Sequence, residues 1–523
     1  MRMRLGGGRW VAGFAALSIG VGLAVSLNPS VAVGAGSPPQ VCGPGGPIEQ
    51  KSPPVDCPMI YVKPTVNLVD LQTVAVQGND FQPSSEAAII ECAANATGQG
   101  QCDLNTLIEL PTGKYGAFTL SRYVRRIITT SDGTTIDCAS APGACILGAA
   151  NLNNLMEATG VPLSFNPSVP PVVPTVFAIP ATGLVDHQLI SVSGVGMFPG
   201  RGIEIEQCVN GTLSYETCDF STQTFVQTGP TGGFQTQWAA HRILYLNGVP
   251  VDCASNPGTC VVFAGDYPGE GSDSATAPLA FKTTVPPVVQ TLAVVPSTGL
   301  RDHQLVQVSG TGYTPGASIG IIQCQAGSSL NNGFGCDYST FQTATGGLSG
   351  KFLITFAVHR LLSAGSTTPV DCAKPNACVI EAANNQRPEE AAGRRVAFNP
   401  AIPPVKASVK VVPSIGLTDN KAVLVTGAGF TPYSNVSINQ CSSEALIGPD
   451  FGYCAGSGPY GGGGINEQVT GNGTFSATLF VHTDITGQSG LINCAAKPGA
   501  CDVVATRFAG GIGDTAFAAL SFL

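Results

Sequence analysis

Hydrophobic and polar residues alternate with a period of two along much of the chain. The segments "QLVQVSG" (304–310) and "GKFLITFAVHRLL" (350–362) follow this alternation closely, and clusters of Gly, Pro or Asn end each run. Such a pattern is typical of half-buried β-strands joined by tight turns, and no segment reads convincingly as a helix. About seven short strands recur in each stretch of roughly 105 residues, which predicts immunoglobulin-like antiparallel β-sandwiches.

The cysteines divide the chain into four copies of one module. A cysteine preceded by Glu or Gln returns at intervals of 116, 116 and 117 residues, and three further cysteines follow each at similar spacings. The four sets are Cys92, Cys102, Cys138 and Cys145; Cys208, Cys218, Cys253 and Cys260; Cys324, Cys336, Cys372 and Cys378; and Cys441, Cys454, Cys494 and Cys501. The remaining two, Cys42 and Cys57, precede the first set and are expected to pair with each other.

Adjacent prolines mark the predicted module boundaries, as in "VPPVV" at 169–173 and 285–289. Two neighbouring prolines favour an extended polyproline conformation, so we expect short, semi-rigid linkers. The predicted modules span 61–167 (module 1), 173–284 (module 2), 289–400 (module 3) and 406–523 (module 4), after a Pro/Gly-rich lead segment at 36–60.

The first 35 residues resemble a secretory signal. Three arginines precede an uncharged apolar run from Trp10 to Leu27, and small residues follow near Ala35. This order predicts a cleaved signal and a secreted, extracellular protein with no membrane partner; an uncleaved anchor is the alternative. Removal of the segment leaves 21 basic and 33 acidic residues, a net charge of −12, which disfavours nucleic acid as a partner.

Short cysteine spacings such as those of "PVDCASNPGTC" (250–260) are compatible with a metal half-site, a redox pair or a local disulfide. Zinc sites commonly use C-x-x-C pairs, and dithiol catalysts place C-x-x-C beside a helix start; neither feature is present. An even number of cysteines in a chain with a secretory signal favours disulfides. We therefore expect all 18 cysteines to be structural.

The five histidines also occupy repeated positions. His187 and His303 lie in "DHQL", and His241, His359 and His482 share a second position. No candidate nucleophile or acid–base partner repeats with them. They are interpreted as structural histidines, solvated or satisfied, and we expect no metal site, no catalytic residue and no enzymatic activity.

Three further motifs are interpreted as structural. "GASIG" (316–320) matches a nucleophile elbow around Ser318, but it leads along a strand and does not repeat. "GTGYTPG" (310–316) resembles a dinucleotide loop without the following helix, so we expect a turn with its aromatic residue packed inward. The cations and aromatic residues of 114–126 are the strongest nucleic-acid feature, and a solvated sheet edge is the preferred interpretation.

Several motifs together resemble the neocarzinostatin family. "PSTGL" (296–300), "QC" (323–324), "CDYST" (336–340) and "VDC" (370–372) occur in the order found in these secreted actinomycete apoproteins, which carry enediyne chromophores. The resemblance covers nearly all of the mature chain as four tandem copies, of which the first is the weakest. It implies seven-stranded sandwiches, each with two short-range disulfides and a cleft beside the first disulfide.

In the family, the chromophore lies against aromatic side chains. The matching positions here are Phe220 and Tyr338, and Tyr245 in the hairpin before the "VDC" strand offers another ring; module 1 has Leu104. The resemblance thus implies a non-covalently bound chromophore and no required cofactor. The chain lacks the family's cleft tryptophan, which is replaced by Ala94, Asn210, Ala326 and Ser443, and a cleft glutamine, which is replaced by Ile146, Val261, Val379 and Asp502.

Three functions remain open from the sequence. The first is a secreted, non-enzymatic protein that holds or sequesters a small apolar or aromatic ligand in its clefts. The second is a structural or adhesive rod of four modules whose clefts have degenerated. The third carries over the family's association with antibacterial and DNA-directed activity. The sequence does not indicate an oligomeric state.

Overall fold

The computed structural model describes residues 58–523 except 97, 212, 215, 266–272, 329–334, 364–368, 445–452, 456–463, 488–489 and 509–512. The predicted signal sequence and the expected pair Cys42–Cys57 lie outside the described residues. Strands dominate the described part, and a 3-10 turn, η1 (Gln99–Gln101), precedes the fourth strand. In the same residues, no helix has the length and apolarity needed to span a membrane.

The strands fall into four successive groups, one for each module. Module 1 contains β1 (Met59–Lys63), β2 (Gln72–Asn79), β3 (Glu86–Ala93), β4 (Cys102–Pro111), β5 (Phe118–Val124), β6 (Ile127–Thr129), β7 (Thr135–Asp137), β8 (Cys145–Asn151) and β9 (Asn154–Leu163). Module 2 contains β10 (Thr175–Ile179), β11 (Thr182–Leu184), β12 (Gln188–Val195), β13 (Gly202–Val209), β14 (Cys218–Gln227), β15 (Phe234–Ala240), β16 (Ile243–Leu246), β17 (Val249–Asp252), β18 (Cys260–Gly265) and β19 (Ser274–Phe281).

Modules 3 and 4 repeat this order. Module 3 contains β20 (Thr291–Val295), β21 (Thr298–Leu300), β22 (Leu305–Thr311), β23 (Ser318–Gln325), β24 (Cys336–Thr345), β25 (Phe352–Ala357), β26 (Leu361–Leu362), β27 (Val370–Asp371), β28 (Cys378–Asn384) and β29 (Ala391–Phe398). Module 4 contains β30 (Ser408–Val412), β31 (Lys421–Ala428), β32 (Asn435–Ser442), β33 (Ile465–Gln468), β34 (Thr474–Val481), β35 (Asp484–Gly487), β36 (Gly490–Asn493), β37 (Cys501–Arg507) and β38 (Thr515–Leu520).

Each module is a sandwich of two sheets, as the alternation predicts. In module 2 the smaller sheet has the order β10-β12-β15, the larger has the order β11-β19-β18-β13-β14, and β16 and β17 form a separate hairpin. Three strands in one sheet and four in the other account for the seven that the sequence predicts. The additional strands are the hairpin and the short β11, which pairs with β19 in parallel rather than antiparallel. The prediction of tandem all-β sandwiches is confirmed.

The core lies between the two sheets and explains a glycine that recurs in every module. In module 2 it contains Ile190, Val192, Trp238 and Ile205. Gly194 has no room for a side chain, because a Cβ atom there would lie 2.3 Å from the ring of Phe234. The same contact joins Gly78 to Phe118, Gly310 to Phe352 and Gly427 to Phe475. The recurring glycine of each module therefore admits a core aromatic ring.

Eight disulfides form in the described residues, two per module, as the resemblance implies. The first joins directly opposite residues of neighbouring strands, such as Cys208 and Cys218, with a Cα–Cα distance of 3.9 Å. The second, such as Cys253–Cys260, anchors the end of the hairpin to the next strand. The remaining pairs are Cys92–Cys102, Cys138–Cys145, Cys324–Cys336, Cys372–Cys378, Cys441–Cys454 and Cys494–Cys501.

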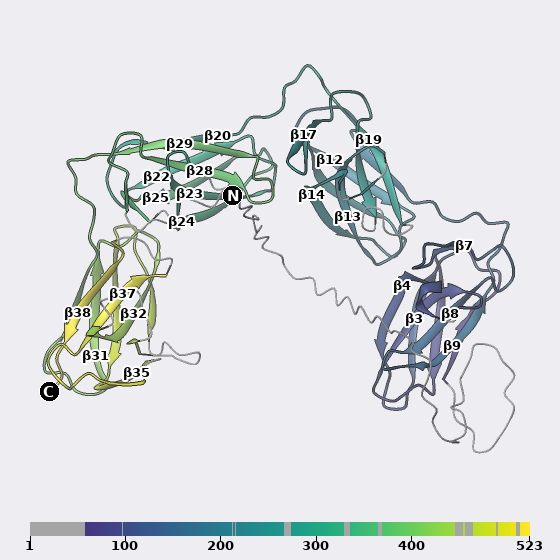
Figure 1. Ribbon diagram of the computed structural model, residues 1–523, viewed down its shortest axis with the longest axis horizontal. Helices are drawn as coiled ribbons and strands as arrows, with labels where there is room; N and C mark the ends of the chain where they lie inside the picture. Colours follow the sequence, from purple (N-terminus) through teal and green to yellow (C-terminus); the bar gives the residue numbers. More distant parts are fainter. Residues whose placement is uncertain are drawn as a thin grey trace, which may run out of the picture.

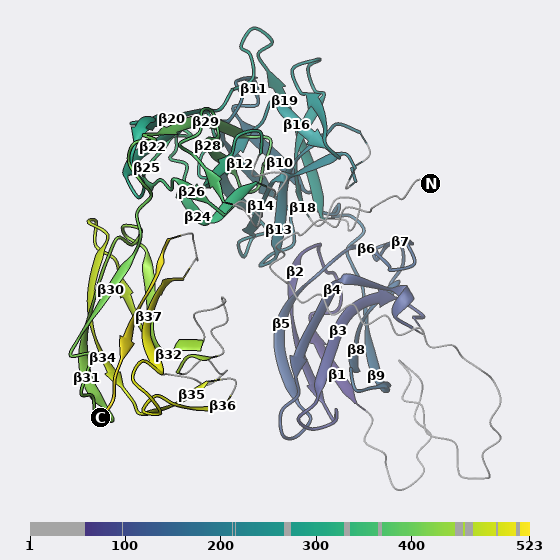
Figure 2. The same cartoon turned by 60° about the vertical axis from the view of Figure 1, so that its left-hand side comes forward.

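An aspartate and an arginine of each of the first three modules hold the linker that follows. In module 2, Asp186 accepts a hydrogen bond from the amide of Val288 at 2.9 Å, and Arg242 donates to the carbonyl of Val285. The counterparts are Asp70 and Arg126 with Val172 and Val169, and Asp302 and Arg360 with Val405 and Ile402. The four modules follow one another as a curved array (Figures 1 and 2).

The stretch 114–126 was predicted to be a solvated sheet edge, and the structure agrees with the edge position but not with the solvation. Its strand β5 does lie at the edge of a sheet, but three of its four cations are buried rather than solvated. Each arginine is buried because it meets one or more carboxylates brought in by the fold. The pairs are Arg122–Glu91, Arg125–Asp70, Arg125–Asp273 and Arg126–Asp137.

Candidate ligand-binding faces of modules 2 and 3

Each larger sheet has one face against the core and an opposite face, here called the outer face. In module 2, Ile203 and Ile205 enter the core, so Glu206 and Cys208 project outward. The Cys208–Cys218 disulfide packs there with Val261 and Phe263 in a separate buried cluster. The cleft implied by the family resemblance would lie on this face.

Exposed aromatic rings stand beside that cluster in module 2. Phe220 is two residues after Cys218 and is 39% exposed. Phe225 is 67% exposed and lies directly opposite Glu204, another outer-face residue. The sequence reasoning identified Phe220 but missed Phe225. Counting alternate strand positions onward from the first disulfide would have placed it on the opposite face, because a bulge shifts the register between Ile205 and Gln207.

Module 3 also has two exposed rings on its outer face, but the second lies two strand positions earlier than Phe225 does in module 2. Tyr338 follows Cys336 by two residues and is 58% exposed. Phe341 is 40% exposed, and its ring covers Gly320, where an added Cβ atom would lie 2.8 Å from the ring. The floor of this face is apolar and contains Ile322, the disulfide and Val379. Sequence reasoning missed Phe341 because nothing local indicates that it packs over a glycine in the neighbouring strand.

Modules 1 and 4 do not reproduce this pair of rings. Module 1 presents Leu104 and Leu107, both partly exposed, at the positions of Tyr338 and Phe341. Module 4 places Asn439 and Asp502 on the outer face, where burial raises the pKa of Asp502. Among the described residues of this module, the exposed ring of Phe517 lies opposite Val504 on the outer face.

Tyr245 lies at the contact between modules 2 and 3. Its backbone amide donates to a carboxylate oxygen of Asp219, the residue before Phe220, at 2.9 Å. The guanidinium of Arg387, from module 3, lies 5.7 Å from the centre of its ring. Burial is the main cause that raises the pKa of Tyr245. The hairpin residue is therefore tied to the strand of Phe220, while its ring meets the next module.

Glu206 is an unusual group on the outer face of module 2. It is fully buried, and neither carboxylate oxygen has a hydrogen-bond partner among the described residues. Burial, with smaller contributions from Glu204 and Asp219, raises its pKa to about 8. Modules 1 and 3 place Ile90 and Ile322 at the same position. A neutral carboxyl group at this place can donate one hydrogen bond and accept others.

The histidines are less solvated than the sequence suggested. His241 and His359 are buried, and burial lowers the pKa of both well below the usual value for histidine. His187 and His303 lie beside them, with ring centres 4.9 and 4.8 Å apart in the two pairs. The side chain of His482, in the last module, is 44% exposed.

Two of the rejected motifs have the structures expected for them. Ser318 begins strand β23, and its hydroxyl accepts a hydrogen bond from Asn385 at 2.9 Å. A nucleophile elbow would instead lead from a strand into a helix. Tyr313, in the glycine-rich turn, is buried in the core as predicted, and its hydroxyl donates to the carbonyl of Ala382.

Comparison with known proteins gives a consistent family assignment. The model of the neocarzinostatin family matches residues 60–165, 176–281, 292–398 and 409–522. Apokedarcidin from an actinomycete is 34% identical over 92 residues, which is 16% of this chain and 80% of the relative. Macromomycin from Streptomyces macromomyceticus is 31% identical over 109 residues, which is 20% of this chain and 74% of the relative.

Solved structures add two likenesses. Macromomycin covers 21% of this chain at 28% identity, with the whole of that structure matched and a TM-score of 0.18. A tetra-tandem repeat from the extending region of a large adhesion protein covers 89% of this chain at 17% identity, with 99% of that structure matched and a TM-score of 0.18. Because the four family matches together span most of the sequence, the chain belongs to the neocarzinostatin family as four tandem copies.

Proposed function

We propose that this chain is a secreted, non-enzymatic binding protein that holds a small apolar or aromatic ligand on the outer faces of modules 2 and 3. One observation carries the proposal: in these two modules, exposed aromatic rings lie on the outer face that also carries the first disulfide. They are Phe220 and Phe225 in module 2, and Tyr338 and Phe341 in module 3. Membership of a family that includes apokedarcidin and macromomycin supports the same role.

The physical basis is the energy of burying aromatic surface. Aromatic rings with a defined orientation contribute both hydrophobic area and stacking to a bound ligand. Exposed apolar side chains that are grouped on a surface often mark a binding site. The leucines of module 1 can bury area but cannot stack. Asn439 and the buried Asp502 on the outer face of module 4 would require polar partners. We therefore expect two binding modules in the chain.

A fluorescent aromatic probe tests this proposal directly. Full-length, untagged protein is titrated with 1-anilinonaphthalene-8-sulfonate, and the F220A/Y338A double variant is expected to bind about tenfold more weakly or worse. Phe177 is a matched control, because it is 49% exposed in module 2 but lies on the smaller sheet. Equal affinity for the wild type and the double variant, or an equal loss in F177A, would contradict the proposal. Native mass spectrometry of the secreted protein would then identify a carried ligand as added mass.

A structural array is the second candidate, and the linker contacts favour it. Three successive Asp–Arg pairs fix the linkers by backbone hydrogen bonds, which restricts the motion between modules. Solution scattering should then show an extended, curved particle. The substitutions D70N, D186N and D302N together should broaden its distribution of distances. A compact particle in the wild type would argue against this role.

DNA-directed activity of the protein alone is the least supported candidate. The arginines of 114–126 that suggested a nucleic-acid surface are buried against carboxylates, so they do not offer free charge to phosphates. A gel shift of duplex DNA at physiological salt is expected to be negative. A shift that falls steeply with salt would revive this candidate.

A further inference from the structure

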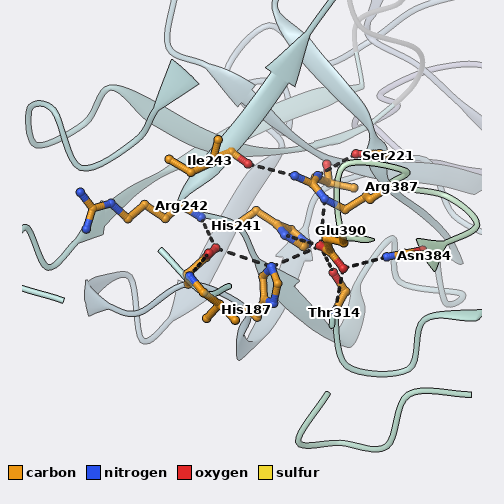
Figure 3. Close-up of polar contacts among 12 residues, drawn as sticks. His187, Ser221, His241, Arg242, Ile243, Thr314, Asn384, Arg387 and Glu390 are labelled. Atoms are coloured by element: carbon orange, nitrogen blue, oxygen red, sulfur yellow. Dashed lines mark hydrogen bonds and ion pairs between the residues drawn. The ribbon is translucent and has the colours of Figure 1, made fainter. Parts of the chain in front are cut away.

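Two histidines of module 2 meet a carboxylate of module 3 at the junction between these modules (Figure 3). The Nε2 atom of His187 lies 3.2 Å from Oε1 of Glu390 and 3.8 Å from Oδ1 of Asp186. The Nδ1 atom of His241 lies 3.8 Å from the same Glu390 oxygen. The donor atoms of Asp186, His187 and His241 all lie within 4.8 Å of one another.

The junction between modules 3 and 4 repeats this cluster with different residues. Nε2 of His303 lies 3.9 Å from Oδ1 of Asp302 and 3.9 Å from Oδ1 of Asp514, which comes from module 4. Asp302, His303 and His359 again place their donor atoms within 4.8 Å of one another. Nε2 of His359 lies 3.3 Å from both Arg507 and Thr431, and Arg507 also lies 3.3 Å from Oδ2 of Asp514, so a ligand bond from His359 would use its Nδ1.

Several of these ring nitrogens have no hydrogen-bond partner among the described residues. They are Nδ1 of His187, Nδ1 of His241, and both nitrogens of His303. The side chains of His241 and His303 are only 2% and 6% exposed. Buried polar atoms are nearly always paired, and two of these nitrogens, Nδ1 of His241 and Nε2 of His303, face carboxylates of their clusters and call for a further ligand. Both histidines of Figure 3 point toward Glu390.

The first junction shows what normally lies between the two carboxylates. There, Leu71 and Arg125 take the positions of the two histidines, and Asp70 and Asp273 take those of Asp186 and Glu390. Nε of Arg125 lies 3.5 Å from Asp70, and its Nη1 bonds to Asp273. A guanidinium thus bridges the two acids. In the later junctions, the arginine at this position is replaced by an imidazole.

We propose that the clusters Asp186–His187–His241–Glu390 and Asp302–His303–His359–Asp514 each bind one divalent transition-metal ion of the zinc class. Imidazole nitrogens and carboxylate oxygens are suitable ligands for such ions. With bonds of 2.0–2.1 Å, a tetrahedral site places neighbouring donor atoms about 3.3 Å apart. The histidine–carboxylate separations of 3.2–3.9 Å are close to this value, whereas the donor atoms of each cluster lie within 4.8 Å of one another and would draw closer on binding.

The surroundings of the first cluster fit a bound dication. Glu390 is oriented by hydrogen bonds from Thr314 and Asn384, and Asp186 by the amide of Arg242, as carboxylate ligands usually are. The nearby Arg387 donates to Asp219, and its Nε also lies 3.1 Å from Oε1 of Glu390, so two acids share one guanidinium. The three carboxylates of Asp186, Asp219 and Glu390 against this one cation leave two negative charges for the ion to neutralise.

The ion has a route of entry and a structural consequence. A groove between modules 2 and 3, lined by Ser221, Gln237, Thr314 and Gln386, reaches His241. Once bound, the ion would join two histidines of one module to an acid of the next. The two later junctions would become metal-stabilised, whereas the first is held permanently by Arg125.

Metal stoichiometry tests the proposal. Full-length, untagged protein is stripped with EDTA, and Zn²⁺ binding is measured by titration calorimetry, with visible Co²⁺ absorption as a second readout. We expect two sites in the wild type, one in H187A or H303A, and none in the double variant. H482A is the matched control, since its histidine occupies the same repeated position as His241 and His359 and is expected to leave both sites intact.

Further variants address folding. H187Q/H303Q retains hydrogen-bonding capacity without a strong zinc ligand and should also bind no ion, while its circular dichroism matches the wild type. L71H/R125H should add a third site at the first junction. Absence of stoichiometric binding in the wild type, unchanged binding in both double variants, or equal loss in H482A would overturn the proposal.

Discussion

Modules 1 and 2 share a fold, two disulfides and the same linker contacts, yet they fill two equivalent buried positions differently. Arg122 of module 1 occupies the position of Trp238 in module 2, and both donate to the same backbone carbonyl, that of Thr106 or Thr222, at 2.7 and 2.9 Å. Arg125 similarly replaces His241. A guanidinium and an aromatic ring can therefore satisfy the same hydrogen-bond acceptor in one scaffold.

The difference extends to the partner of each side chain. Glu91 lies beside Arg122, whereas the equivalent Gln207 forms a neutral network in which it accepts from the amide of His241 and donates to its carbonyl. Module 1 thus uses a buried ion pair where module 2 uses an amide and an indole. Buried ion pairs are strongly destabilising when broken but are often replaceable as a unit.

The largest expected effect comes from breaking this pair. Arg122→Ala should destabilise module 1 by about 3–5 kcal/mol, because it leaves Glu91 buried without its cation. Hydrogen exchange of β4 and β5 in the full chain measures the loss. The paired transplant E91Q/R122W should recover most of it. A loss below about 1 kcal/mol, or a transplant no better than the single variant, would contradict the paired exchange.

The next effect concerns the other arginine of module 1. Arg125→Ala should weaken the first junction by about 3 kcal/mol, because Asp70 and Asp273 lose the cation between them, although both keep backbone donors. Hydrogen exchange of the Phe198 amide, which bonds to Asp273, reports the opening. Arg301→Ala on the exposed surface of module 3 should leave that amide unchanged. Equal exchange in both variants would show that Arg125 does not hold the junction.

These arginines also mark the limit of what the sequence predicts. The alternation of residues and the cysteine spacings predicted the sandwich and its disulfides because they are local signals. The burial of Arg122 and Arg125 depends on acids 31 and 148 residues away. The His187–Glu390 contact depends on the next module. A charged residue on an alternating strand gives no sign of a partner that tertiary structure supplies.

On the outer faces, too, some residues could be predicted from local motifs and others could not. Phe220 and Tyr338 could be identified because the family motif fixes their distance from the first disulfide. Phe225 and Phe341 could not, because the bulge in each strand changes which residues project outward. Tyr245 was assigned to a cleft from its hairpin alone, and only the packing of module 3 reveals its contact with Arg387.

A third position reverses the comparison, since module 2 buries an acid where module 1 has Ile90. Glu206→Ile should stabilise module 2 by about 1–3 kcal/mol at pH 8, because it removes an unpaired buried carboxyl group. Its folded-state pKa of about 8 lies above the unfolded value of 4.5. The unfolded chain therefore loses the proton first, and the contribution of Glu206 to stability falls as pH rises from 4.5 to 8.

Denaturant unfolding at several pH values measures this effect. The wild-type stability should decline across that interval more steeply than that of Glu206→Ile. I322E in module 3 is the reciprocal variant, and it should introduce a similar decline. Parallel pH profiles for the wild type and Glu206→Ile would mean that the carboxyl group finds a partner in solution.

The smallest effect is expected where the two modules agree. Arg126–Asp137 in module 1 and Arg242–Asp252 in module 2 have the same N–O distance of 2.8 Å and the same exposures, 11% for the arginine and 38% for the aspartate. Partly exposed pairs of this kind contribute less than about 1 kcal/mol. Asp137→Asn and Asp252→Asn should therefore cost equally little in denaturant unfolding, because each arginine keeps its bond to a linker carbonyl. A loss several times larger in module 1 than in module 2 would mean that the additional buried ion pairs of module 1 also strengthen its arginine–linker contact.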